Sequence, residues 1–295
     1  MKIGITGYSG FIGSKVLEQL LNDNSVDEIH LIGRSPIPDY IKPKTKFFYF
    51  DLVNSSESYD EELDILIHLG GKIRKTHVES YSKKEYFDAN VYATYNLLTH
   101  VIARRFIYVS TVDVYGKNSF DKLVNENVNP EPSEVYALTK YLGEEVSRKT
   151  FKNDNLLIAR LGNVFGPGDL SLKLIQIAIS NIQSGRKIKM YGEGTYTRDY
   201  IFVDDAVSLL INLSKGKYNG IVNIVSGKNY QISEVLSLIC SIFNVNYEKT
   251  VEKINIDELP KSITFDNSLV KSLVKQFNFT ELSKGLEQTI EKNIS

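Results

Sequence analysis

The start of the chain constrains its fold more than any other part. Residues 2–6 form a short apolar run with β-branched members, and residues 14–22 carry apolar side chains at helical spacing. Three glycines, Gly7, Gly10 and Gly13, stand between these segments. Glycines in such a place permit a tight turn, close approach of the backbone to a pyrophosphate, and close packing of helix on strand. The pattern predicts a dinucleotide site whose phosphates face the helix N-terminus.

The glycine spacing is Gly-x-x-Gly-x-x-Gly, and an ordinary tight strand-to-helix turn is the alternative interpretation. Taken with Thr6, residues 6–13 resemble the opening of the extended short-chain dehydrogenase/reductases. That family comprises epimerases, dehydratases and reductases that mostly act on nucleotide sugars. The resemblance implies that Phe11 and Ile12, in the same turn, also bind the cofactor.

The expected fold is α/β, with a Rossmann-type doubly wound parallel sheet and a smaller mixed α/β substrate domain. The alternation of strands with helical segments favours the same class. We expect residues 1–165 and about 200–224 to form the NAD(P)-binding domain. Residues from about 166–199 and 225–295 are expected to bind the substrate, a nucleoside-diphosphate sugar.

Composition excludes several classes of partner. The chain has 295 residues and a formal net charge of −1, which gives no reason to expect nucleic acid binding. A single cysteine, Cys240, excludes an internal disulfide and suits a cytoplasmic location. No apolar run approaches the roughly 18 residues that a membrane span needs. The four histidines show no metal-ligand spacing, so we expect no metal site.

The end of the second predicted strand, residues 28–32, bears on the choice of cofactor. An acidic residue there would bind the 2′-hydroxyl of NAD, whereas an arginine accommodates the 2′-phosphate of NADP. The strand is followed by Gly33, Arg34 and Ser35, with no acid. This favours NADP. NAD remains the alternative if Arg34 is solvated and the backbone binds the ribose.

Three further segments gain roles from the family resemblance. The predicted strand at residues 46–50 ends in an acidic turn, which the resemblance implies contacts the adenine. The predicted strand at residues 65–69 ends in a glycine-rich turn, which the resemblance implies lies against the cofactor. A predicted helix at residues 86–100 corresponds to the helix beside the nicotinamide half. The cofactor-binding residues implied by these segments are Asp51, Leu52, Leu69, Gly70, Gly71 and Asn90.

A catalytic group is predicted after the fifth strand, residues 105–110. Thr111 leaves that strand at its carboxyl end, where ligands bind in open α/β sheets. Tyr136 and Lys140 are four residues apart in a helical stretch and therefore share a face. A phenol has a pKa of about 10, and a nearby positive charge favours its phenolate. Tyr136 would then transfer a proton to or from an oxygen of the substrate that Thr111 also binds.

Two alternatives to this group stay open at this point. Ser110 stands beside Thr111 and offers the same hydroxyl. Tyr40 and Lys44 repeat the spacing of Tyr136 and Lys140, although Pro43 between them argues against a helix.

Two residues in the second half resemble the family's substrate contacts. Asn163 lies in a stretch, residues 160–168, whose family counterpart touches the sugar-phosphate. Arg198 corresponds to an arginine that reaches the diphosphate, a task that suits a guanidinium fork. A surface salt bridge between Arg198 and Asp199 is the alternative.

The predicted reaction is NADP(H)-dependent reduction of a keto-deoxy sugar linked to a nucleoside diphosphate. Hydride would come from the nicotinamide and the proton from Tyr136. A nucleotide-sugar 4-epimerase is the main alternative. A 4,6-dehydratase is less favoured because Val112 and Asp113 stand where that subfamily has Asp and Glu. A non-catalytic NADP-binding sensor is disfavoured because Tyr136 and Lys140 are both present.

The same resemblance implies a homodimer. In the family, the helices equivalent to those carrying Asn90 and Tyr136 pair across a two-fold axis. Apolar positions expected to support such pairing are Leu97, Leu98, Leu138 and Leu142.

Overall fold

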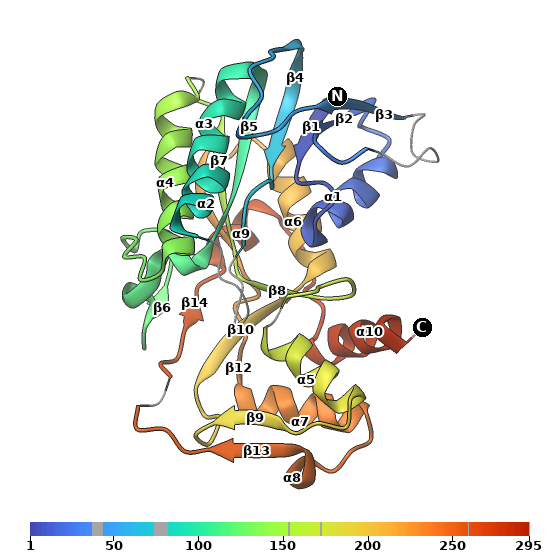
Figure 1. Cartoon of the computed structure of the whole chain (residues 1–295), viewed down its shortest axis with the longest axis vertical. Coiled ribbons are helices and arrows are strands. Elements are labelled where there is room, and N and C mark those ends of the chain that lie inside the picture. Colours follow the sequence, from blue (N-terminus) through green and yellow to red (C-terminus); the bar gives the residue numbers. More distant parts are fainter. Residues whose placement is uncertain (37–43, 74–81, 153, 172, 259, 295) are drawn as a thin grey trace.

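A computed structural model describes residues 1–36, 44–73, 82–152, 154–171, 173–258 and 260–294 of the chain. Figure 1 shows its elements in two groups. A large sheet flanked by helices forms the upper part, and smaller sheets with their own helices lie below it.

The large sheet has seven strands in the order β11-β7-β5-β4-β1-β2-β3, and all neighbouring strands are parallel. The predicted doubly wound parallel sheet is therefore confirmed. The strand order reverses between β1 and β4, and ligands of open α/β sheets bind outside the carboxyl ends of the strands at such a point. The strands are β1 (Lys2–Thr6), β2 (Glu28–Gly33), β3 (Thr45–Tyr49), β4 (Tyr59–His68), β5 (Val101–Thr111), β7 (Leu156–Leu161) and β11 (Gly220–Ile224).

Helices cover both faces of this sheet, as its nearly continuous apolar strands require. In Figure 1, α2, α3 and α4 lie on one side, and α1 and α6 on the other. The side chains of Ile5, Ile67 and Phe106 are fully buried in the central strands. The helices are α1 (Phe11–Leu21), α2 (Lys83–Phe87), α3 (Ala93–His100), α4 (Val135–Thr150) and α6 (Val203–Lys215).

The prediction of one continuous helix over residues 86–100 is wrong in detail. The segment consists of α2, a π-helical turn η2 (Asp88–Tyr92) and α3. A π-turn inserts an extra residue into the helical repeat, and hydrophobic periodicity alone does not reveal it. Such turns are frequent at functional sites.

The lower part is built on a three-stranded sheet of order β12-β10-β8 and a pair β13-β9. Residues 163–165 and 200–202, assigned by sequence to the cofactor domain, lie in the three-stranded sheet. The elements here are β8 (Asn163–Phe165), α5 (Leu174–Gln183), β9 (Ile188–Tyr191), β10 (Thr197–Phe202), β12 (Asn229–Gln231), α7 (Ile232–Ile242), α8 (Tyr247–Thr250), β13 (Val251–Ile254) and α10 (Leu282–Ile294).

Short elements connect the two parts. A 3-10 segment η3 follows β5 directly. Strand β14, near the end of the chain, pairs with β6, which follows η3. These elements are η3 (Val112–Ser119), β6 (Leu123–Val124), β14 (Thr264–Phe265) and α9 (Ser268–Leu273).

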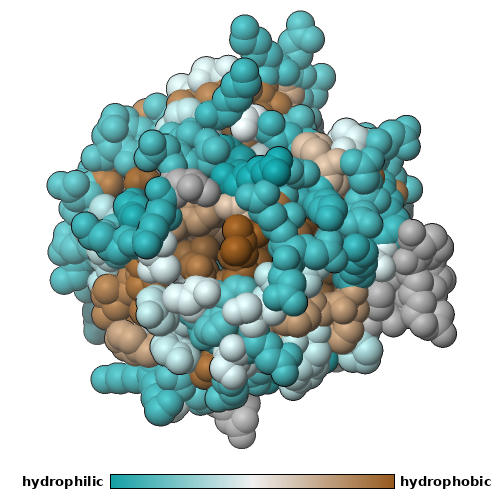
Figure 2. Space-filling model, turned by 90° about the horizontal axis from the view of Figure 1, so that it is seen from above, coloured by the Kyte–Doolittle hydropathy of each residue, from teal (hydrophilic) through white to brown (hydrophobic). Residues whose placement is uncertain are grey.

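The face seen from above in Figure 2 is dominated by hydrophilic side chains, with a hydrophobic area visible in a central hollow. Among the described residues, no helix combines the length and apolar character needed to cross a membrane.

Candidate active site

The glycine turn forms a close contact between the loops after β1 and β4. Gly7 has a φ of +70°, and a Cβ there would lie 2.7 Å from the Gly70 nitrogen. A Cβ on Gly13 would lie 2.0 Å from the Gly7 carbonyl oxygen, so larger residues are excluded at both positions. Gly10 precedes α1 as its N-cap and provides no side-chain cap. Phe11 and Ile12 begin this helix, whose first backbone amides are suited to bind an anion.

A buried histidine orders the same two loops. The Gly70 amide donates to the Thr6 hydroxyl at 3.1 Å, and Thr6 Oγ1 lies 2.6 Å from His68 Nδ1. His68 Nε2 lies 3.2 Å from the Thr94 hydroxyl, which donates to the Asn90 carbonyl. Burial lowers the pKa of His68 to about 3, helped by the charge of Lys140, so the imidazole is neutral. Sequence reasoning missed this network because its members lie on separate strands and helices.

Asn90 lies in the π-turn and fixes the loop that follows β4. Its Oδ1 accepts from the Lys72 amide at 2.8 Å, and its Nδ2 donates to the Lys72 carbonyl and to Thr139 Oγ1. A Cβ on Gly71 would lie 2.6 Å from Asn90 Oδ1. Asn90 thus joins the loop after β4, which includes Leu69, to helix α4.

The end of β2 is shaped by Tyr8, a residue that sequence reasoning also missed. A Cβ on Gly33 would lie 3.2 Å from the Tyr8 ring, and the Tyr8 hydroxyl donates to the Ser35 carbonyl. The Arg34 side chain is 72% exposed, with Nη1 at 3.8 Å from Asp51 Oδ2. This loose ion pair leaves the guanidinium accessible to an anion.

Asp51 organises the turn after β3. Its Oδ1 accepts from the amides of Val53 and Asn54. Burial raises the pKa of Asp51, but the amides of Val53 and Asn54, with the Asn54 side chain and Arg34, bring it below its ordinary value. Leu52 lies beside the loop after β4, where a Cβ on Gly70 would be 2.7 Å from Leu52 Cδ1.

The structure brings Thr111, Tyr136 and Lys140 together. Tyr136 and Lys140 lie one turn apart on α4, and the Thr111 side chain at the end of β5 is hydrogen-bonded to Tyr136. Lys140 is buried, with Nζ 4.3 Å from the centroid of the Tyr108 ring. Burial lowers the pKa of Lys140 to about 7, while the negative charge of Glu144 acts in the opposite direction.

Burial outweighs the lowering of the phenol pKa that the spacing of Tyr136 and Lys140 predicted. The pKa of Tyr136 is raised, mainly by burial and further by the negative charge of Asp113. The hydrogen bond from Thr111 opposes this but does not outweigh it. Tyr136 is therefore a neutral phenol at ordinary pH, and sequence spacing carries no information about the desolvation that decides this.

The structure gives Ser110 and Lys44 other partners than this group. Ser110 donates to Glu144 Oε1 at 2.6 Å, whereas Thr111 Oγ1 accepts from the Asp113 amide at 3.2 Å. Tyr40 lies outside the described residues. Lys44 Nζ donates to the carbonyls of Leu20, Leu21 and Asp23 at the end of α1.

The predicted substrate residues lie on the strands of the lower part. Asn163 Nδ2 donates to the Asp199 carbonyl at 2.9 Å. Arg198 Nη1 donates to the Thr197 and Lys261 carbonyls, and burial lowers the pKa of Arg198. The Asp199 carboxylate faces elsewhere, because it accepts from the Ser226 and Gly227 amides.

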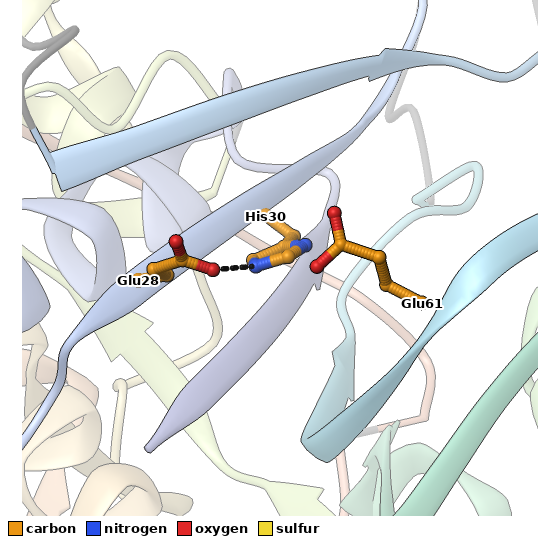
Figure 3. Close-up of side chains that lie close together, drawn as sticks. All are labelled: Glu28, His30 and Glu61. Atoms are coloured by element: carbon orange, nitrogen blue, oxygen red, sulfur yellow. Dashed lines mark hydrogen bonds and ion pairs between the residues drawn. The ribbon is translucent and has the colours of Figure 1, made fainter.

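A second cluster lies at the opposite end of the sheet. Within the part of the chain that is described, one group of side chains lies close enough together to hold a metal ion. It consists of Glu28, His30 and Glu61, whose possible ligand atoms lie within 4.8 Å of one another (Figure 3). Their spacing in the sequence did not suggest this group, since Glu61 comes from β4. Lys2 and Lys46 lie 2.9 Å and 3.1 Å from the Glu61 carboxylate. These ammonium groups already supply the positive charge, so the cluster is better described as a salt-bridge network.

Comparison with known proteins shows which family the chain is similar to. A model described as "NAD dependent epimerase/dehydratase family" matches residues 3–224. A dTDP-D-glucose 4,6-dehydratase of Homo sapiens is 30% identical over 274 residues, which cover 85% of this chain and 77% of that protein. A dTDP-D-glucose 4,6-dehydratase of Dictyostelium discoideum is 29% identical over 275 residues, covering 83% of this chain and 62% of the relative.

Among solved structures, the chain is similar to a UDP-glucuronic acid 4-epimerase from Bacillus cereus in complex with NAD. The identity is 26%, the TM-score is 0.83, and the match covers 99% of this chain and 98% of that one.

Proposed function

The chain belongs to the NAD-dependent epimerase/dehydratase family, and on this premise we propose that it reduces a keto-deoxy sugar linked to a nucleoside diphosphate, using NADPH. The observation that supports this most is the grouping of Tyr136 and Lys140, one turn apart on α4, with Thr111 at the end of β5. Burial raises the pKa of Tyr136, which keeps its phenol in the proton-donating form. Reduction of a ketone begins with a proton donor in place, whereas oxidation of an alcohol begins with a base.

The glycine turn fits a dinucleotide. A Cβ at Gly7 or Gly13 would collide with backbone, and α1 begins without a side-chain cap, so its amides face the space that a pyrophosphate requires. Arg34 at the end of β2 fits a 2′-phosphate, and no carboxylate of residues 33–35 would repel it. When bound, the reduced nicotinamide supplies the hydride.

The residues of the site then divide the proton chemistry between them. Thr111 donates a hydrogen bond to the keto oxygen and holds it beside Tyr136. Tyr136 donates its phenolic proton to that oxygen as the alcohol forms. The Lys140 ammonium stabilises the phenolate that remains, because an opposite charge nearby favours the ionised phenol. Asn163 and Arg198 are the proposed contacts for the sugar-phosphate portion.

The position after Thr111 argues against dehydration. Val112 is buried and has no group that transfers a proton. Asp113 is exposed and raises the pKa of Tyr136, which favours the proton-donating form. Asp113 therefore assists the reductive direction in this proposal.

A nucleotide-sugar 4-epimerase is the second candidate. It is supported by the match to the Bacillus cereus 4-epimerase over 99% of this chain. The two candidates differ in cofactor balance, since a reductase consumes one NADPH per product and an epimerase consumes none.

The test follows from this difference. NADPH absorbance is recorded with nucleotide-linked 4-keto-6-deoxy sugars, and a parallel incubation contains UDP- or dTDP-hexoses without added cofactor. Stoichiometric loss of NADPH absorbance in the first supports the reductase. Inversion of the hexose in the second, with no loss in the first, would replace it by the epimerase.

We also propose a homodimer. Of the four leucines that the sequence suggested for pairing, Leu97 is buried in the subunit's own core, while Leu138 is exposed. Phe87 of α2, Tyr92 of η2 and Tyr95 of α3 are large exposed side chains, and the rings of Tyr92 and Tyr95 lie 6.3 Å apart. Light scattering should give twice the chain mass at micromolar concentration, and a monomeric mass would contradict this proposal.

A further inference from the structure

Helix α4 carries a longer stripe of charged and polar residues than the catalytic pair. Glu144 follows Lys140 by four residues, as Lys140 follows Tyr136, so the three side chains share one helix face. Glu144 is fully buried, and charged residues are rarely buried unless they are paired. Its surroundings therefore indicate what it does.

The Glu144 carboxylate holds two neighbouring strands. Oε1 accepts from the Ser110 hydroxyl at 2.6 Å and from Arg160 Nε at 2.9 Å, and Oε2 accepts from Arg160 Nη2 at 2.7 Å. Ser110 and Arg160 are direct partners in the register of β5 and β7. Ser110 also precedes Thr111. The carboxylate thus joins α4 to the strand end that presents Thr111.

Charged and titratable groups surround Lys140 and Glu144 from every neighbouring element. Around Lys140 lie Tyr136 and Glu144 on its own helix, the neutral His68 of β4 and the Tyr108 ring of β5. Around Glu144 lie Arg148 of α4 at 3.5 Å and Arg160 of β7, whose guanidinium faces the Tyr115 ring. Among these groups, Glu144 is the anion that acts on Lys140.

We propose that Glu144 is a positioning residue: its carboxylate serves as the counter-charge of the Lys140 ammonium and clamps helix α4 to the strand end that carries Thr111. Glu144 acts on the reaction through Lys140 and Thr111 and does not itself touch the substrate. The inference rests on the proposed use of Tyr136 and Lys140, but not on the identity of the sugar or the cofactor.

The most direct test is the titration of Lys140 in the whole protein. Lysine is labelled with 13C at Cε, and the Lys140 signal is identified by its loss in Lys140→Met. In the wild type the midpoint should lie at about 7. Glu144→Gln should lower it by about one pH unit or more, the low end for removing a nearby opposite charge. Glu144→Asp keeps the negative charge, so its Lys140 midpoint should lie close to that of the wild type.

Glu145→Gln is the matched control. Glu145 is the adjacent residue of α4, and its half-exposed carboxylate pairs with Arg148, which also lies 3.5 Å from Glu144. The substitution removes the same charge one position away and should leave the Lys140 midpoint unchanged. An equal lowering in Glu144→Gln and Glu145→Gln would show a general charge effect and overturn the proposal.

A second variant guards against misfolding. Glu144→Gln leaves the buried Arg160 without its ionic partner, and breaking a buried pair is strongly destabilising. Replacing both members together, in Glu144→Met with Arg160→Met, avoids the unpaired charge. The double variant removes the carboxylate that shares a helix face with Lys140, so it should also lower the midpoint. An unchanged midpoint there would contradict the proposal. No substrate is needed, so failure of the proposed function would not affect the outcome.

Discussion

The two ends of the seven-stranded sheet both gather histidine, lysine and carboxylate side chains, with opposite consequences. At the amino ends, Glu61 pairs with Lys2 and Lys46 in the open, and their proximity lowers the pKa of Glu61 to about 2. At the carboxyl ends, Lys140 is buried over an aromatic ring, and its pKa falls to about 7. Paired surface charges are stable and inert, whereas a buried charge near its titration point is available for chemistry.

The largest expected effect at the carboxyl end follows Tyr136→Phe. Only a hydroxyl is lost, so fold and cofactor binding should persist. Turnover should fall at least about 10²-fold, the low end for general acid–base catalysis. Steady-state rates with a fluorescence titration of NADPH measure both. Near-normal turnover would remove Tyr136 from its proposed role.

The next effect concerns cofactor choice at the end of β2. Charge-assisted hydrogen bonds contribute about 1.5–3 kcal/mol each, so one or two from Arg34 predict a preference for NADP over NAD of roughly 10- to 1000-fold. Replacing Gly33 by Asp together with Arg34 by Ala should reverse it. Arg34→Ala alone should weaken NADP and leave NAD nearly unchanged. If that single substitution weakens the binding of NADP and NAD equally, Arg34 does not select between the two cofactors.

Lys140→Met separates stability from function. In the unfolded chain Lys140 binds its proton up to about pH 10.5, but in the fold only below about 7. Burial of Lys140 therefore lowers the free energy of unfolding. This loss grows as pH falls from 10.5 to 7 and then levels off. The variant should lose turnover yet unfold at a higher temperature, with a larger gain at pH 7 than at pH 10. A gain that is independent of pH would contradict the lowered pKa.

The smallest effect is expected at the amino end. Glu61→Gln removes an exposed partner of two lysines, and such pairs contribute little because water screens them. The pKa of Glu61 is lowered, so whatever it contributes is present above about pH 4.5 and lost as pH falls toward 2. Thermal unfolding at pH 7 should therefore change little. A large loss would mean that this network stabilises the fold as much as the buried one.

The same contrast shows how far sequence reasoning reaches. The glycine turn and the spacing of Tyr136 and Lys140 are local patterns, and they led correctly to the sheet and to the grouping on α4. Partners joined by strand register are not local. Glu144 meets Ser110 and Arg160 because α4 packs across β5 and β7, which pair at those two residues, and His30 meets Glu61 because β2 and β4 flank β1.

Electrostatic properties were the least accessible from sequence. The pKa of Tyr136 is raised because folding removes its hydroxyl from water, and desolvation depends on the whole surrounding packing. The π-turn at Asp88–Tyr92 is likewise a tertiary feature, since the apolar pattern of residues 86–100 reads as an unbroken helix.

Isotope transfer distinguishes net reduction, with Tyr136 as the proton donor, from epimerisation. NADPH carrying deuterium at the transferable position of the nicotinamide is mixed with a nucleotide-linked 4-keto-6-deoxy sugar, and the product is analysed by mass spectrometry. We expect one deuterium on the former carbonyl carbon for each NADP released by the wild type, and we expect both to be lost together in Tyr136→Phe. A product without deuterium, or a sugar inverted at that carbon while the cofactor pool stays unchanged, would contradict it.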